Sequence, residues 1–179
     1  ATPLHYRIEP ADLHAHLFHV TLTIAQPAAQ QRVALPVWIP GSYLVREFAK
    51  NLQNLRATQG RRSVPLQQLD KATWQVDAAP GKPLVLTYAV YALDNSVRTA
   101  WLDASRGFFN GTSLCLQVAG QETLPHTLEL VSTRATAAWH VATGLPTVAT
   151  DTRGFGSYVA DDYDALVDHP FELGHFWSG

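Results

Sequence analysis

The chain has 179 residues, 46% of them hydrophobic, which is enough to bury a sizeable core and predicts a single domain covering residues 1–179. A formal net charge of -2, with no basic run longer than Arg61-Arg62, argues against nucleic acid or an anionic membrane as a partner. No apolar stretch approaches the roughly 18 residues that cross a bilayer, so we expect a soluble chain.

Alternation of apolar and polar residues predicts strands, and the first lies over residues 18–24, where Phe18, Val20, Leu22 and Ile24 share one side. Further runs rich in β-branched and aromatic residues predict strands at residues 32–39, 73–76, 84–91, 114–118, 127–131 and 139–142. Turn-forming residues separate these runs. Many short strands with frequent turns predict an all-β fold, an antiparallel β-sandwich-like domain.

Two short segments predict helical turns within this β-rich chain. Ser42 is placed to cap a turn over residues 43–49. Asp161 or Asp162 is placed to cap a second turn, which must end before Pro170 because a proline disfavours helical backbone at the preceding residue. We expect neither turn to hold the fold together.

Histidines gather near the start of the first predicted strand, at His14, His16 and His19. A catalytic zinc centre needs at least three protein ligands, and the sequence contains neither HExxH nor a cysteine pair to complete a set. His14 and His16 lie four and two positions before Phe18, so on a regular strand all three side chains share one face. We therefore expect the two histidines to be partly exposed strand residues at the end of the apolar stripe. The sequence therefore predicts no metal site.

The single cysteine, Cys115, lies in an apolar run where burial would raise the pKa of its thiol and leave it inert. One cysteine excludes an internal disulfide and leaves the compartment, cytoplasmic or periplasmic, open. The nucleophile pattern Gly-x-Ser-x-Gly and the phosphate-binding loops are also absent. We therefore expect no catalytic residue in this chain.

A long loop of mixed chemistry is predicted between residues 94 and 113. It carries Arg98 and the strong turn former Asn110-Gly111. Two interpretations stay open from the residues alone. The segment is either a plain hairpin tip with aromatic side chains packed beneath it, or a loop that meets a ligand or a neighbouring domain.

Large apolar side chains also gather near the C-terminus, at Phe171, Leu173, Phe176 and Trp177. Such a tail needs a surface against which to be buried. It either folds back on its own sheet or begins a connection into another domain, and the residues alone do not separate these two interpretations.

Three segments resemble the N-terminal domain of the glycyl aminopeptidase family: LPVWIPGSYLVREF at residues 35–48, SVR at 96–98 with RGFFNGTS at 106–113, and DYDALVDHPFELG at 162–174. The stretches PGSYLVREF and RGFFNGTS are the most specific, and they occur in the order that the family has. The likeness covers nearly the whole chain.

The resemblance implies a zinc metallopeptidase that removes small N-terminal residues, glycine and alanine above all, from peptide substrates. In that family a thermolysin-like catalytic domain with HExxH follows the β-rich domain, and a PDZ domain comes after it. The sequence ends before any HExxH. We therefore expect zinc, the catalytic domain and the PDZ domain to belong to the parent enzyme, and the fragment to be inactive alone.

The resemblance also implies roles for particular residues. It favours docking on the downstream catalytic domain, for which the candidates are Phe171, Glu172, Phe176 and Trp177. By analogy with the related aminopeptidase N architecture, loops of the N-terminal domain help to wall the substrate entrance. The candidates for that position are Arg98, Asn110 and Gly111.

The alternative hypothesis is a self-standing β-sandwich binding module for carbohydrate or peptide, with aromatic side chains as its platform. The two hypotheses differ in what they predict. The enzyme-domain hypothesis predicts an isolated chain that lacks peptidase activity and exposes an apolar face. A metal-dependent hydrolase built on the histidines at positions 14–19 ranks below both.

Overall fold

Strands make up nearly all of the regular structure in this computed structural model. It describes residues 4–12, 15–34, 52–70, 73–79, 81–91, 100–102, 106–109, 115–133, 136, 139–151, 154–167 and 171–174. The predicted all-β, sandwich-like fold is confirmed. Its strand pairs are antiparallel apart from one parallel pair at the centre of the largest sheet.

The largest sheet has eight strands in the order β14-β15-β12-β1-β2-β8-β4-β5. These strands are β1 (Leu4–Asp12), β2 (Leu17–Ile24), β4 (Leu52–Gln59), β5 (Arg62–Ser63), β8 (Leu84–Tyr91), β12 (His126–Leu130), β14 (Thr147–Thr150) and β15 (Gly156–Ala160). The parallel pair is β1 with β12, so the chain must cross from one end of the sheet to the other between them.

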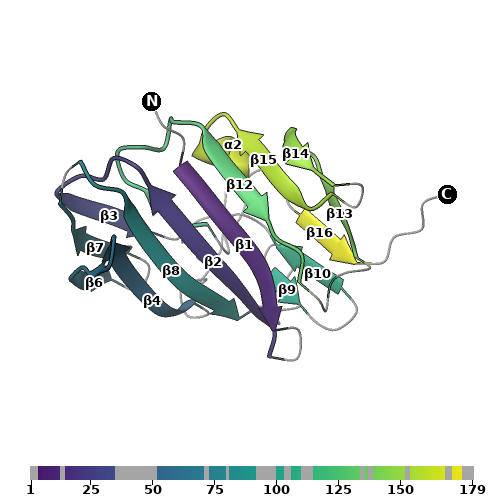
Figure 1. Cartoon of the computed structure of the whole chain (residues 1–179), viewed down its shortest axis with the longest axis horizontal. Helices are drawn as coiled ribbons and strands as arrows, with labels where there is room; N and C mark the ends of the chain where they lie inside the picture. Colours follow the sequence, from purple (N-terminus) through teal and green to yellow (C-terminus); the bar gives the residue numbers. More distant parts are fainter. Residues whose placement is uncertain are drawn as a thin grey trace, which may run out of the picture.

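Two smaller sheets, each of four strands, complete the domain. One has the order β13-β16-β10-β9, with β13 (His140–Thr143), β16 (Phe171–Gly174), β10 (Arg106–Phe109) and β9 (Ala100–Leu102). The other has the order β11-β3-β7-β6, with β11 (Gln117–Val118), β3 (Gln30–Ala34), β7 (Thr73–Asp77) and β6 (Leu66–Asp70). Figure 1 shows the β9–β10–β16 group toward the right end of the large sheet and the β3–β7–β6 group toward the left end.

The buried core lies between the large sheet and the two smaller ones. Along β2, apolar side chains such as Phe18 point inward and are fully buried, whereas the intervening His19 is exposed. Phe18 meets the ring of Phe109 on β10 edge-on, with 5.4 Å between the ring centroids. On the same inner face, Tyr6 of β1 donates a hydrogen bond to the backbone of Leu116, next to β11. Both small sheets therefore cover one face of the large sheet.

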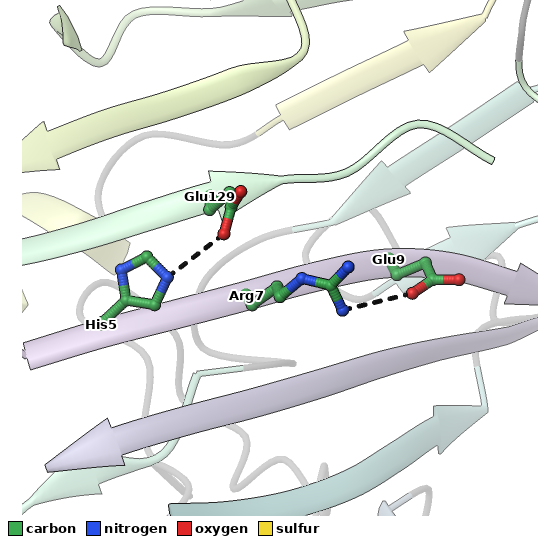
Figure 2. A network of polar contacts seen from close by, with 4 residues as sticks. All are labelled: His5, Arg7, Glu9 and Glu129. Carbon is green, nitrogen blue, oxygen red and sulfur yellow. Dashed lines mark hydrogen bonds and ion pairs between the residues drawn. The ribbon is translucent and has the colours of Figure 1, made fainter. Parts of the chain in front are cut away.

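The opposite face of the large sheet is polar (Figure 2). The Nε2 atom of His5 lies 3.3 Å from a carboxylate oxygen of Glu129, and a guanidinium nitrogen of Arg7 lies 3.5 Å from Glu9. These side chains are between 33% and 46% exposed. Ion pairs in such positions contribute about 0–1 kcal/mol, so this face adds charge and solubility more than stability.

Five of the predicted strands match the structure closely. The predicted strand at residues 84–91 is confirmed as β8, and those at 18–24, 73–76, 127–131 and 139–142 correspond to β2, β7, β12 and β13 within one residue at each end. The prediction at residues 114–118 was too long, because the structure has only the two-residue β11 there and Cys115 and Leu116 bond to tyrosine side chains instead. Of residues 32–39, the described part, 32–34, belongs to β3, and the rest of that prediction lies outside the described residues.

One correction concerns the region between residues 94 and 113, which the sequence predicted as a single long loop. The structure contains the paired strands β9 and β10 there. The pattern was hidden because the strands are short and include Gly107, which is unfavourable in most strands. Packing around this glycine is tight, because a Cβ atom would lie 3.2 Å from the side chain of Leu102, which would have to shift to make room.

The second predicted helical turn is confirmed as α2 (Tyr163–Val167). Its cap is Asp162, whose carboxylate accepts a hydrogen bond from the backbone of Ala165 at 2.8 Å. The first predicted turn, at residues 43–49, lies outside the described residues. No helix in the described part of the chain is long and apolar enough to cross a membrane.

Candidate functional site

The strands that flank the predicted entrance residues meet at one edge of a small sheet. Register places Ala100, the first residue of β9, opposite Phe109, the last residue of β10. Phe109 also faces Phe171, which begins β16. Arg98, Asn110 and Gly111 lie outside the described residues, but the strand ends next to them in sequence share this edge. We take this edge as the candidate site.

Aromatic packing holds the end of β10, the strand that precedes Asn110. Phe109 is fully buried and stacks on Phe171, with ring centroids 4.9 Å apart and an interplanar angle of 11°. Tyr158 meets Phe171 edge-on at 5.2 Å. Contacts of this geometry add to the stabilisation from burial alone, so β10 ends at a well-anchored residue.

After Asn110 and Gly111, the next residue that the structure describes is Cys115. Hydrogen bonds with tyrosine side chains hold the backbone of Cys115 and Leu116. Cys115 and Leu116 are fully buried. The hydroxyls of Tyr6 and Tyr163 donate to their backbone carbonyls, and the Leu116 amide donates to the hydroxyl of Tyr88. Sequence reasoning did not single out these tyrosines. Alternation marks Tyr6 and Tyr88 as inward-facing, but no local pattern indicates what their hydroxyls meet.

Cys115 is buried, as predicted. Its side chain is fully buried, and burial raises the pKa of the thiol well above its ordinary value. No basic group contributes to that shift. The thiol therefore stays protonated and packs as a small apolar group.

The structure separates the four candidate docking residues. Phe171 is only 1% exposed and belongs to the core of this domain, whereas its neighbour Glu172 is exposed. Phe176 and Trp177 lie outside the described residues. For Phe171 the tail therefore folds back on its own sheet, and docking on another domain remains a prediction for Glu172 and the two aromatic residues.

The apolar face expected of an isolated enzyme domain is not found in the part of the chain that the structure describes. The large apolar side chains that are exposed there are Leu69 on β6, at 40%, and Val148 on β14, at 63%. They lie on separate sheets and neither is aromatic. These two residues do not form the aromatic platform that the binding-module alternative requires.

The histidine cluster does not form a strand end as expected. His16 lies in a turn before β2 with a φ of 60°. It is therefore not a strand residue, and the expectation that it shares a strand face with Phe18 is wrong. Its Nδ1 atom lies 2.5 Å from the carbonyl oxygen of Leu102, and its ring meets Tyr91 edge-on. His14 lies outside the described residues. Among the described residues, no three His, Cys, Asp or Glu side chains are placed to hold a metal ion.

His126 is the most unusual titratable group near the tyrosines. It is fully buried, stacks on Tyr6 and meets Tyr163 edge-on. Its Nδ1 atom lies 2.6 Å from the Leu124 carbonyl oxygen, and its Nε2 atom has no hydrogen-bond partner among the residues that the structure describes. Burial lowers the pKa of the imidazole, and the hydrogen bond to Leu124 and the carboxylate of Asp162 only partly oppose this shift.

This lowered pKa predicts a loss of stability in mild acid. As the pH falls below about 6.5, the unfolded chain takes up a proton at His126 before the folded chain does. The free energy of unfolding should then fall by up to about 1.4 kcal/mol per pH unit until the pH reaches the folded-state pKa. Above about pH 6.5 this residue should add no pH dependence.

Urea denaturation of the wild type and of His126→Phe between pH 5 and 8 measures the effect. Phenylalanine retains the ring stack on Tyr6 and cannot titrate. Subtracting the two pH profiles removes the contributions of all other groups. Parallel profiles would show that His126 has an ordinary pKa in the folded state.

Comparison with known proteins identifies relatives over almost the whole chain. Residues 5–175 match the family described as the peptidase M61 N-terminal domain. An aminopeptidase N family protein from Idiomarina loihiensis, whose crystal structure is known, is 47% identical with a TM-score of 0.92. The match covers 96% of this chain and 29% of that one, so the present chain spans less than a third of that relative. No curated protein matches the chain.

More distant structures share the fold. An M1 zinc metallopeptidase from Deinococcus radiodurans is 15% identical with a TM-score of 0.52, over 96% of this chain and 40% of that one. Native yeast LTA4 hydrolase is 8% identical with a TM-score of 0.55, over 98% of this chain and 29% of that one. At these identities the likeness concerns the fold alone.

Proposed function

Because this chain belongs to the peptidase M61 N-terminal domain family, we propose that it is the non-catalytic first domain of a zinc-dependent glycyl aminopeptidase. In this proposal the domain packs on the catalytic domain and shapes its substrate entrance. The observation that carries it is the family match over residues 5–175, together with the meeting of β9, β10 and β16 at one sheet edge. The substrate is a peptide with a small N-terminal residue, glycine above all.

The entrance role is supported by how firmly the edge is held. The ring of Phe109 anchors the chain before Asn110, and Cys115 is anchored after Gly111. In the proposal, Asn110 supplies amide groups and Arg98 a positive charge at the entrance.

Zinc belongs to the catalytic domain in this proposal, and the described residues of this chain do not fit a zinc site. The sequence lacks HExxH, and the described histidines are dispersed over separate elements. When bound in the parent enzyme, zinc would activate the water that attacks the peptide bond. The contribution of this chain is positioning, with the downstream catalytic domain of the same chain as its partner.

The full-length protein provides the test of the entrance role. We expect Arg98→Ala and Asn110→Ala each to lower kcat/KM for a peptide with N-terminal glycine by about tenfold, since misplaced substrate reacts slowly. Zinc content and thermal stability should stay at the wild-type values. The matched control is Arg61→Ala, which removes an exposed cation from the turn between β4 and β5.

Two results would count against the proposal. If Arg98→Ala and Asn110→Ala both leave kcat/KM at the level of the control, the loop does not contact the substrate. If the coding sequence downstream of Gly179 lacks HExxH followed by a further glutamate ligand, the parent protein is not a zinc peptidase of this type.

A further inference from the structure

A small surface pocket of about 170 Å³ lies where the β11-β3-β7-β6 sheet meets the turn that follows β11. Figure 1 shows β3 and β7 toward the left end of the large sheet, away from β9, β10 and β16. The residues that line the pocket come from β3, β7, β11 and the turn, and those that give it its shape and charge are Arg32, Ala34, Thr73, Gln117, Ala119 and Glu122.

The strand register explains why a hollow forms at this place. Val33 is fully buried, so its neighbours Arg32 and Ala34 point to the opposite face of β3, away from the core. Ala34 pairs with Thr73 of β7 on one side and with Gln117 of β11 on the other, and opposed residues in antiparallel strands share a face. The short side chain of Ala34 therefore forms a floor between longer side chains.

Two opposite charges line this hollow. Within the part of the chain that the structure describes, Arg32 and Glu122 form no ion pair with each other or with another side chain. The Nε atom of Arg32 donates a hydrogen bond to the side-chain oxygen of Gln75 at 3.3 Å. That bond uses one of the five N–H groups of the guanidinium, so the groups on the two terminal nitrogens can serve a ligand.

The two charges suit a molecule that carries an anion and a cation at once. A guanidinium can donate two parallel hydrogen bonds to a carboxylate. The carboxylate of Glu122 and the amide oxygen of Gln117 can accept hydrogen bonds from an ammonium group. A cavity of roughly 150 Å³ holds benzene, which has as many non-hydrogen atoms as alanine. A small amino acid therefore matches the pocket in both charge and size.

We propose that this pocket binds a small zwitterionic amino acid such as alanine, with its carboxylate on Arg32 and its ammonium group on Glu122. The inference does not depend on the proposed peptidase function, because it rests on the residues of the pocket alone. Arg32 is exposed and Glu122 is partly exposed, so water weakens both ion pairs. We expect a Kd of about 1 mM.

Saturation-transfer NMR of the full-length protein with alanine tests the inference. An excess of a peptide hydroxamate, which chelates zinc, blocks the catalytic centre of the proposed enzyme, so the remaining signal reports binding elsewhere. We expect Arg32→Ala and Glu122→Gln each to weaken this remaining binding by about tenfold. Arg61→Ala, which removes an exposed cation from the turn between β4 and β5, is the matched control and should bind as the wild type does.

Blocked forms of alanine test which residue meets which charge. N-acetylalanine has the carboxylate but no ammonium group, and alaninamide has the ammonium group but no carboxylate. We expect both to bind the wild type about tenfold more weakly than alanine does. Arg32→Ala should leave the binding of alaninamide unchanged, and Glu122→Gln should leave that of N-acetylalanine unchanged.

A third variant fills the pocket without changing its charge. Ala34 is partly exposed, so Ala34→Leu should fold and unfold thermally near the wild-type temperature. We expect it to abolish the binding of alanine in the presence of the hydroxamate. Unchanged binding in this folded variant would overturn the inference.

Two other results would overturn it. One is the absence of alanine binding by the wild type when the hydroxamate is present. The other is equal binding by Arg32→Ala, Glu122→Gln and Arg61→Ala. If the parent protein has no zinc centre, the hydroxamate has no effect and the proposed function fails, but the comparison of these variants still decides whether the pocket binds alanine.

Discussion

Replacing Phe171 with alanine should lower the free energy of unfolding by about 3–5 kcal/mol. The ring is 1% exposed, stacks on Phe109 at 4.9 Å and meets Tyr158 edge-on at 5.2 Å. Alanine would remove both aromatic contacts and leave a cavity where β16 meets the large sheet. Equilibrium unfolding in urea, followed by tryptophan fluorescence, measures the change.

The neighbouring residue supplies the control for this prediction. Glu172 is exposed on the same strand, so Glu172→Ala should change stability by no more than about 0.5 kcal/mol. A similar small effect at both positions would mean that Phe171 is not part of the core. A large effect at Glu172 alone would mean that β16 is held mainly by its outward face.

Gly156→Ala should be the second strongly destabilising change, by about 3 kcal/mol. Gly156 begins β15 with a φ of 141°, a backbone conformation that residues with a side chain rarely adopt. A Cβ atom there would lie 2.1 Å from the backbone oxygen of Ala149 on β14. The obstacle is backbone, so the pairing of β14 with β15 must open to relieve the clash.

A second glycine with positive φ separates the two causes of that loss. Gly120 has a φ of 85° and open space where a Cβ atom would lie, so Gly120→Ala carries the conformational cost without a clash. We expect a loss of about 1 kcal/mol at Gly120. Thermal or urea unfolding of both variants provides the comparison, and equal losses would show that the contact with β14 is unimportant.

Clean local patterns made some elements predictable. β2 alternates apolar and polar residues from Phe18 to Ile24, and β8 is a run of apolar and aromatic residues interrupted only by Thr87. The cap of α2 was likewise readable, because Asp162 precedes a short run that ends before Pro170. In these elements, neighbours in sequence carry the signal.

Other strands were missed by the sequence analysis. β1 does carry a local signal, because Leu4, Tyr6 and Ile8 alternate with polar residues, and it pairs with β2 and, in parallel, with β12. β14 is exposed along its length and exists because β15 pairs with it. β9, β10 and β16 are short, and each pairs with a strand distant or hidden in the sequence pattern.

The candidate site likewise has features that the sequence indicated and features that only the structure revealed. The resemblance of RGFFNGTS drew attention to the segment around Asn110, because a motif is a property of consecutive residues. It did not indicate that Phe109 stacks on Phe171. It also did not indicate that the residues following the segment bond to tyrosine hydroxyls.

By itself, then, the amino-acid sequence determined the β-rich character of the chain, its resemblance to one peptidase family and its lack of an HExxH motif, because each is written in local pattern or composition. Only the tertiary structure decided which strands pair, that Phe171 belongs to this domain's core, and that Tyr163 holds Cys115 from 48 residues away. The physical reason is that these depend on long-range packing and on hydrogen bonds whose partners meet only when the chain has folded.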